Sequence, residues 1–489
     1  MKKSVEQHFN QLSVEETDEL ITKDVKIKIP GKGKKRIREQ TAQKTGIKTP
    51  THRSIPWRIA AMAAAACVSL VLIWLAGGKI FSSGPVDTQS NPSAGATQKP
   101  TAAPPAATDP PAPAFISWPA ATDFNTRYAT FSVELFKKSF DNEKNALVSP
   151  LSVLLALAMT ANGAEGETLA EMEQAMSGLP IADFSHALLE YVYALPSSDK
   201  AKLHIANSIW FRDTPELTVV EEFLRTNQDT FAAEIRKEPF DDQTVGAIND
   251  WADKHTDGMI QKIIENIDPD VMLYLINAMA FDAEWEKIYI DHYIQEGIFT
   301  AVNGKKQPTD FMHSDEGVYL SDEKATGFLK PYAGGRYAFA AVLPNEGTVL
   351  ADYAAGLTGE GWINLLKTAS EERVYAVIPK FAFEFELELK NNLQSVGMER
   401  AFTPQAEFGR MARLVPDGPL YIGRVIHKTF IAVDERGTRA GALTNVAIER
   451  GGGETMPKVV ILDRPFLFAI VDTQAGLPIF IGAVNTISN

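Results

Sequence analysis

The residues best suited to chemistry lie between Asp434 and Pro465, where an arginine precedes a run of glycines. Arg450 is followed by Gly451-Gly452-Gly453, three residues that carry no side chain. The arginine offers a cation that the acidic specificity pocket of a protease can pair. The chemistry that these residues suggest is cleavage of this chain by another protein, and not a reaction that the chain catalyses.

Residues typical of catalytic and metal sites are present, but their spacing fits no known site. The chain has eight histidines: His8, His52, His186, His204, His255, His292, His313 and His427. None falls in an HExxH motif, and there is no GxSxG motif, Walker loop or strand-linked GxGxxG. His427 lies in an apolar stretch, where a lone histidine is usually a hydrogen-bonded core residue. The sequence therefore predicts neither an enzyme nor a cofactor or metal site.

The segment after Gly437 has the two-residue period of a strand with one buried face. One alternate set contains small residues and then larger apolar ones: Thr438, Ala440, Ala442, Thr444, Val446 and Ile448. The other set carries both charges of this window: Arg439, Gly441, Leu443, Asn445, Ala447 and Glu449. The segment starts without bulky apolar residues and ends in glycines. We therefore predict an exposed loop that can become a strand, hinged at Gly437, where φ is least restricted.

Composition and charge indicate a large acidic globular body. Of the 489 residues, 45 % are hydrophobic and 22 % are charged. Residues 1–58 contain 14 Lys/Arg and 7 Asp/Glu and so carry a net charge of +7. Because the whole chain has a net charge of −14, residues 59–489 carry −21. An acidic body argues against a nucleic-acid partner. Because Cys67 is the one cysteine, no intrachain disulfide can form and stability must come from a packed core.

The first 119 residues predict a cytoplasmic segment, a membrane span and a linker. Residues 1–58 are basic and too poor in apolar residues for a core, so we expect them to be mostly disordered. Ile59–Gly78 is uncharged, and twenty residues at ~1.5 Å each span the ~30 Å hydrocarbon layer. The basic excess upstream predicts a signal anchor with the N-terminus in the cytoplasm and the rest of the chain outside the cell. Residues 79–119, rich in Pro, Ala and Thr, predict a semi-rigid linker before a domain over 120–489.

In that domain, apolar periodicity predicts mostly early helices and late strands, which favours an α+β fold. Ser149 before Pro150 is typical of a helix start, since it supplies a capping hydroxyl and then a proline in the first turn. Thr168 and Glu171 have the spacing of a capping box for a further helix. The short apolar or alternating runs that predict strands are Leu203–Phe211, Tyr274–Phe281, Val374–Ile378, Phe381–Leu387, Phe466–Val471 and Ile479–Val484.

Blocks on both sides of the predicted loop resemble the serpin family. Val425–Thr438 looks like the serpin strand and hinge before the reactive-centre loop, and Arg464–Phe468 with Ile479–Gly482 looks like the strands after it. The resemblance covers roughly Asp123 to Ile487. It implies a serpin fold with a large central sheet, further sheets, surrounding helices and an exposed reactive-centre loop.

The same resemblance implies an inhibitor of serine proteases, or of cysteine proteases, that acts as a suicide substrate. Cleavage of the loop would form an acyl-enzyme, and the loop would then insert into the sheet as a new strand. We expect the inhibitor to act as a monomer whose partner is the target protease.

Site residues follow from the resemblance. The implied hinge comprises Glu435, Gly437, Thr438, Ala440, Gly441, Ala442 and Thr444. The residues implied beneath the centre and top of the main sheet are Ser149, Ser152, Asn277, Trp285 and His427. Among these, His427 is expected to bond Asn277 and keep the central strands shut. Asp282-Ala283-Glu284 stands where the family usually has lysine–glycine–lysine, which argues against glycosaminoglycan contact.

Two scissile bonds stay open at this stage. The family's usual spacing, counted from Glu435, gives Gly451-Gly452, whereas side-chain chemistry favours Arg450-Gly451 and a trypsin-like target. Two other functions also remain. One is a non-inhibitory serpin carrier or chaperone, which the small inward residues of the hinge contradict. The other is an anchored adhesion module that binds a surface ligand through its acidic body.

Overall fold

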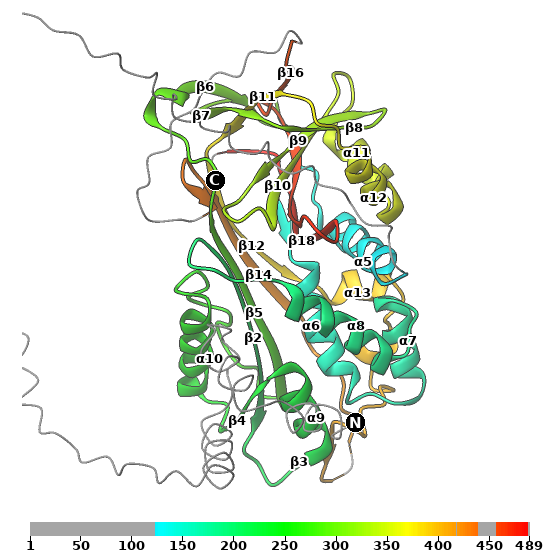
Figure 1. The fold of residues 1–489 in the computed structure, drawn as a ribbon. Helices are drawn as coiled ribbons and strands as arrows, with labels where there is room; N and C mark the ends of the chain where they lie inside the picture. The colour runs from blue at the N-terminus through cyan, green and yellow to red at the C-terminus, as the bar shows by residue number, and fades with distance from the viewer. Residues whose placement is uncertain (1–122, 417, 439–455, 488–489) are drawn as a thin grey trace, which may run out of the picture. The chain divides into compact units, whose positions relative to one another are not determined.

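The computed structural model describes residues 123–416, 418–438 and 456–487 (Figure 1). The predicted cytoplasmic segment, membrane span and linker lie outside these residues, and so does most of the predicted loop, 439–455. In the part that the structure describes, no helix is both long enough and apolar enough to cross a membrane.

The central feature is a six-stranded sheet, which we call the main sheet. In spatial order its strands are β12 (Phe381–Glu388), β14 (Ile426–Val433), β15 (Gly437–Thr438), β5 (Leu273–Glu284), β2 (Ala201–Arg212) and β4 (Glu234–Glu238). All neighbouring strands pair antiparallel except β2 and β4, which are parallel. β15, of which the structure describes two residues, pairs with both β14 and β5.

Two further sheets and a strand pair complete the β structure. The second six-stranded sheet has the order β1 (Ala146–Val148), β18 (Leu477–Val484), β17 (Phe466–Asp472), β10 (Tyr337–Pro344), β9 (Ala325–Pro331) and β8 (Val318–Ser321). A four-stranded sheet has the order β16 (Lys458–Ile461), β11 (Val374–Pro379), β7 (Lys306–Glu316) and β6 (Ile294–Thr300). The pair is β13 (Ala412–Leu414) with β3 (Leu217–Val219).

The described helices gather mainly in the first half of this region, as the sequence predicts for an α+β fold. They are α5 (Asp123–Ser139), α6 (Pro150–Ala161), α7 (Gly166–Met176), α8 (Ile181–Ala194), α9 (Glu221–Phe231), α10 (Asp242–His255), α11 (Leu350–Gly356), α12 (Gly359–Lys367) and α13 (Lys390–Ser395). Two short 3₁₀ turns, η1 (Asp291–Tyr293) and η2 (Arg400–Phe402), connect strands and loops.

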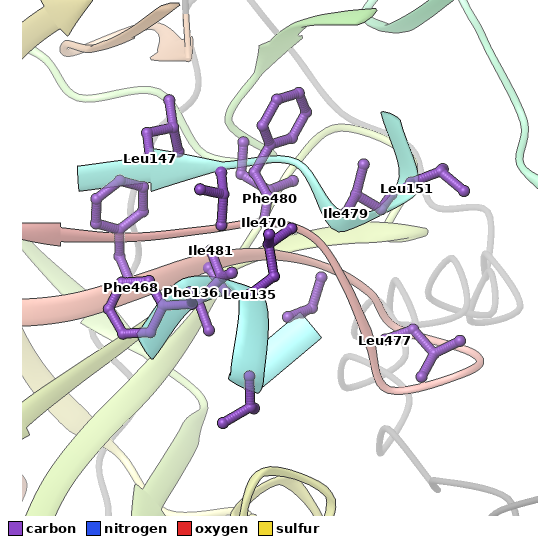
Figure 2. Close-up of a cluster of buried hydrophobic side chains, with 14 of the residues drawn as sticks. Leu135, Phe136, Leu147, Leu151, Phe468, Ile470, Leu477, Ile479, Phe480 and Ile481 are labelled. Carbon is purple, nitrogen blue, oxygen red and sulfur yellow. The ribbon is translucent and has the colours of Figure 1, made fainter. Parts of the chain in front are cut away.

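The principal hydrophobic core lies where α5, α6 and β1 meet the β17–β18 hairpin. Figure 2 shows Leu135, Phe136, Leu147 and Leu151 in one cluster with apolar side chains of the two hairpin strands. These four residues are at most 3 % exposed, so each contributes roughly 1.5–3 kcal/mol by burial.

Both faces of the main sheet are covered, which explains why its central strands read as apolar runs. On one face, alternate residues of β5 such as Met279 and Phe281 join the principal core, and α6 contacts this strand. On the other face, Ile276 packs in a separate cluster with Ile248 and Trp251 of α10. A residue that enters this sheet facing the principal core is therefore buried, and α10 covers part of the opposite face.

The start of α6 follows its sequence prediction. Ser149 is the N-cap, and its hydroxyl oxygen accepts from the backbone N–H of Ser152 at 3.3 Å. Pro150 occupies the first helical position, where a missing N–H costs no helical hydrogen bond.

The predicted capping box of the next helix is wrong. α7 starts at Gly166, which places Thr168 inside the first turn. The Glu407 carboxylate instead accepts from the backbone N–H of Thr168 at 3.3 Å, and Glu171 accepts from the backbone N–H of Arg400 at 2.6 Å. The cap thus comes from a segment far along the chain.

Candidate functional site: the hinge at the top of the main sheet

The hinge begins with a turn that reverses the chain after β14. The Asp434 carboxylate accepts from the backbone N–H groups of Arg436 at 2.8 Å and Gly437 at 3.2 Å. The backbone N–H of Asp434 donates to the carbonyl of Gly437 at 3.0 Å. Burial raises the pKa of Asp434. These bonds turn the chain back alongside β14 in the antiparallel direction.

After this turn, two residues lie between β14 and β5. Thr438 pairs with Val433 on one side and Ala283 on the other, and Gly437 pairs with Glu284. The first residues of the segment predicted to become a strand are therefore already paired.

Glycine is required at position 437 because of a close approach, and not because of an unusual φ. A Cβ atom there would lie 1.9 Å from the carbonyl oxygen of Ala283, a backbone atom that cannot rotate away. The φ angle of Gly437 is not in the left-handed region. The sequence predicted glycine at this position for its freedom of φ. The structure instead explains the glycine by the lack of space for a Cβ atom.

Three residues, Trp285, Tyr289 and Tyr332, hold the hinge in place, and we call them the hinge clasp. The indole N–H of Trp285 donates to the Asp434 carbonyl at 2.8 Å, and its backbone N–H donates to the Arg436 carbonyl at 2.7 Å. The backbone N–H of Tyr289 donates to the Glu435 carbonyl at 2.9 Å. Three consecutive carbonyls of the hinge are thereby fixed by one short segment that follows β5.

The third clasp residue, Tyr332, bonds the side chain of Thr438. The Thr438 and Tyr332 hydroxyls form a hydrogen bond at 2.5 Å, and Thr438 is only 3 % exposed. The rings of Trp285 and Tyr332 stack with centroids 4.5 Å apart and planes at 13°. Thr438 therefore faces inward, as its predicted parity requires. The other predicted hinge and scissile residues, Ala440, Gly441, Ala442, Thr444, Arg450, Gly451 and Gly452, lie outside the described residues.

Glu435 links the hinge to the nearer edge of the main sheet, where β12 lies. Its carboxylate lies 2.9 Å from the ammonium of Lys380, the residue before β12. On the other side of the hinge, Glu284 lies 3.3 Å from Lys200. The unusual acidic residues at the end of β5 thus stand beside the hinge, and at least Glu284 has a cationic partner.

The residues predicted beneath the sheet have different partners from those expected. Nε2 of His427 accepts from the backbone N–H of Ser149 at 3.0 Å, and burial lowers the pKa of His427 to about 4. Asn277 instead donates to Oδ1 of Asn207 in β2 at 2.8 Å, and its own buried Oδ1 has no partner among the described residues. The predicted bond between His427 and Asn277 is wrong. His427 thus bonds the residue that caps α6, and Asn277 bonds the neighbouring strand β2.

Sequence reasoning missed two clasp residues and the charges beneath them. Tyr289 and Tyr332 give no periodic signal of their own, because their role depends on the hinge folding back onto them. Lys330 did carry a signal, since it is a single lysine in the apolar run Phe328–Tyr332. It is 2 % exposed and forms an ion pair with Glu316.

The fold and the hinge together define a class of protein. In this class, the first residues of a connecting segment already lie between two strands of a large sheet. The chain belongs to the serpin family, because residues 126–487 match the family described as Serpin (serine protease inhibitor). Members of this family are generally protease inhibitors and act as suicide substrates, although some are non-inhibitory.

Individual relatives agree with this assignment. The chain is 46 % identical to the thermophilic serpin Tengpin, whose native-state crystal structure matches with a TM-score of 0.72 over 76 % of this chain and 96 % of that one. It is 31 % identical to an uncharacterized serpin-like protein of Thermococcus kodakarensis, over 72 % of this chain and 83 % of that one. It is 30 % identical to Iripin-2 of Ixodes ricinus, over 70 % of this chain and 88 % of that one. Thyroxine-binding globulin, at 20 % identity and a TM-score of 0.66, shares the fold alone.

Proposed function

We propose that this protein inhibits serine proteases by acting as a suicide substrate. One observation carries the proposal: Thr438, a small side chain, is buried between β14 and β5 at the entry to the main sheet. A carrier or chaperone does not insert its loop, so its function does not require a small, buried residue at the first inward position of the hinge. Cysteine proteases, which also form acyl-enzymes, are a second target class.

The proposed reaction has one covalent step. The protease serine oxygen attacks the carbonyl carbon of Arg450, the bond to the Gly451 nitrogen breaks, and the new amine leaves with a proton from the protease. Arg450 stays attached to the protease as an ester. The freed arm from Arg439 onward then continues the strand that Gly437 and Thr438 begin.

Strand insertion supplies the driving force. About ten new ladder hydrogen bonds at ~0.5–1.5 kcal/mol each give roughly 5–15 kcal/mol, before side-chain burial. This is comparable with the ~5–15 kcal/mol stability of a whole domain, so it suffices to distort an attached protease. The uncut protein persists because the barrier to insertion is high, which is kinetic stability.

A single gel tests inhibition against both rival functions. The protein is mixed with a trypsin-like serine protease and the products are boiled in detergent. We expect a covalent complex with the summed mass of the protease and the cut inhibitor. If only cleaved chain and free protease appear across trypsin-like, elastase-like and cysteine proteases, the inhibitor proposal fails and a carrier or adhesion function takes its place.

The same reaction identifies the scissile bond. We propose cleavage at Arg450-Gly451, since Arg450 offers the cation that a trypsin-like pocket pairs. Mass spectrometry of the peptide released from the complex should show Gly451 as its first residue. A peptide that starts at Gly452 supports the alternative bond and a target that accepts small residues.

We further propose that Ile59–Gly78 anchors the inhibitor in the cell membrane with residues 120–489 outside the cell. The proposal rests on the uncharged stretch and the basic residues before it. Adding protease to intact cells should remove the inhibitor domain from the membrane fraction. Full protection of the domain in intact cells, with digestion only after lysis, would contradict this topology.

A further inference from the structure

Next to the hinge clasp lies a buried ion pair that the proposed inhibition does not itself require. Lys330 in β9 is 2 % exposed, and Glu316 at the end of β7 is 8 % exposed. The ammonium nitrogen lies 2.8 Å from Oε1 of Glu316. Lysine is almost never buried to this degree unless it is paired. An apolar residue at position 330 would fit its strand neighbours, so the charge calls for a reason.

The Lys330 ammonium faces two of the three clasp residues. Its Nζ lies 4.3 Å from the centre of the Tyr289 ring and 5.3 Å from the centre of the Trp285 ring. It also donates to the carbonyl of Lys287, between those two residues, at 3.4 Å. A cation above desolvated aromatic rings is attracted by their negative faces. Lys330 thus contacts the segment from Trp285 to Tyr289 at three of its residues.

Glu316 holds the same segment from the other end. Oγ of Ser314 lies 2.6 Å from Oε1 of Glu316 and 3.1 Å from the hydroxyl of Tyr289. The carboxylate therefore fixes both Lys330 and, through Ser314, the tip of Tyr289. Movement of Tyr289 away from the hinge therefore breaks its bond to Ser314, the residue that also bonds Glu316.

We propose that Lys330 and Glu316 are positioning residues that keep the uncut loop from inserting too early. Trp285 and Tyr289 bond three consecutive hinge carbonyls, at the end of the sheet where β14 and β5 must part. Separating the clasp from Lys330 and Glu316 would remove the contacts of the ammonium with both rings, its bond to the Lys287 carbonyl and the bond between Tyr289 and Ser314, which makes opening costly. The pair thereby raises the barrier to spontaneous insertion. This inference rests on the proposed function.

Three variants separate positioning from general stability. Lys330→Met removes the cation at similar size, and Lys330→Arg keeps it. Lys330→Met with Glu316→Gln also removes the unpaired carboxylate, so this variant is expected to fold even if the single variant does not. Lys324→Met is the matched control, because Lys324 is an exposed lysine in the turn before the same strand.

Each variant is incubated uncut, and samples are taken over time for residual protease complex formation and for protection of the loop against thermolysin. We expect Lys330→Met and the double variant to convert to a loop-protected, non-inhibitory form at least tenfold faster than wild type. Lys330→Arg and Lys324→Met should convert within twofold of the wild-type rate. A double variant that converts at the wild-type rate would overturn the proposal, because the cation would then do nothing for the clasp.

The two readouts keep this inference apart from the proposed function. If no variant ever forms a protease complex, the inhibitor proposal fails, while thermolysin protection still reports the rate of insertion. If complexes form normally but all variants become protected at one rate, the inference about Lys330 and Glu316 fails alone.

Discussion

Thr438 offers the sharpest test of the hinge, because an arginine there would be expelled from β15 in the uncut protein and would have to be buried again before insertion can proceed. Replacing Thr438 with arginine removes the bond to the Tyr332 hydroxyl and places a guanidinium where the present side chain is 3 % exposed. An uncompensated buried charge costs about 3–5 kcal/mol. At 1.4 kcal/mol per tenfold change, the lower value slows insertion by about a hundredfold. Hydrolysis of the acyl-enzyme is not slowed, so the protease should escape.

The assay is the yield of covalent complex per cleaved inhibitor, measured on gels over a range of inhibitor-to-protease ratios. Thr438→Arg should be cut normally but yield little complex, which is the behaviour of a substrate. Arg439→Thr is the outward control and should stay an inhibitor. The double variant Thr438→Arg/Arg439→Thr keeps the composition and net charge of the chain and only moves the arginine from the outward to the inward position. It should therefore also behave as a substrate. Wild-type yield from Thr438→Arg in a folded protein, checked by circular dichroism, would refute the parity argument.

Three further outcomes follow from the described contacts. Gly437→Ala places a Cβ atom 1.9 Å from the Ala283 carbonyl oxygen, so we expect about 1–3 kcal/mol of destabilisation and a lower yield of the protease complex. An unchanged thermal unfolding temperature would refute this. Thr438→Val leaves the fully buried Tyr332 hydroxyl unpaired at a cost of about 1–3 kcal/mol, and adding Tyr332→Phe should recover most of it in a double-mutant cycle. His427 has a pKa of about 4 in the folded protein, against an ordinary value of 6.5. Its neutral form therefore stabilises the fold above pH 6.5, and this contribution of about 3 kcal/mol is lost as the pH falls from 6.5 to 4. Urea unfolding at pH 7 and pH 4.5 should show a smaller loss for His427→Gln than for wild type; an equal loss would assign the acid sensitivity to other groups.

Local patterns in the sequence predicted the features that depend on near neighbours. The start of α6 is one, since Ser149 caps a helix that begins at the next residue. The β17–β18 hairpin is another, because two apolar strands are joined by a short turn. The inward direction of Thr438 also follows from a period of two, which holds wherever the segment is a strand. Such features need no knowledge of what lies across the sheet.

Tertiary structure alone decided the partners of buried polar groups. His427 bonds Ser149 and not Asn277, because β14 and β5 are not directly paired at that level of the main sheet. Lys330 finds Glu316 only because the chain brings β7 and β9 to the base of the hinge clasp. A periodic pattern states which face of a strand is buried, but the strand order and spacing of the folded sheets determine which atoms meet there.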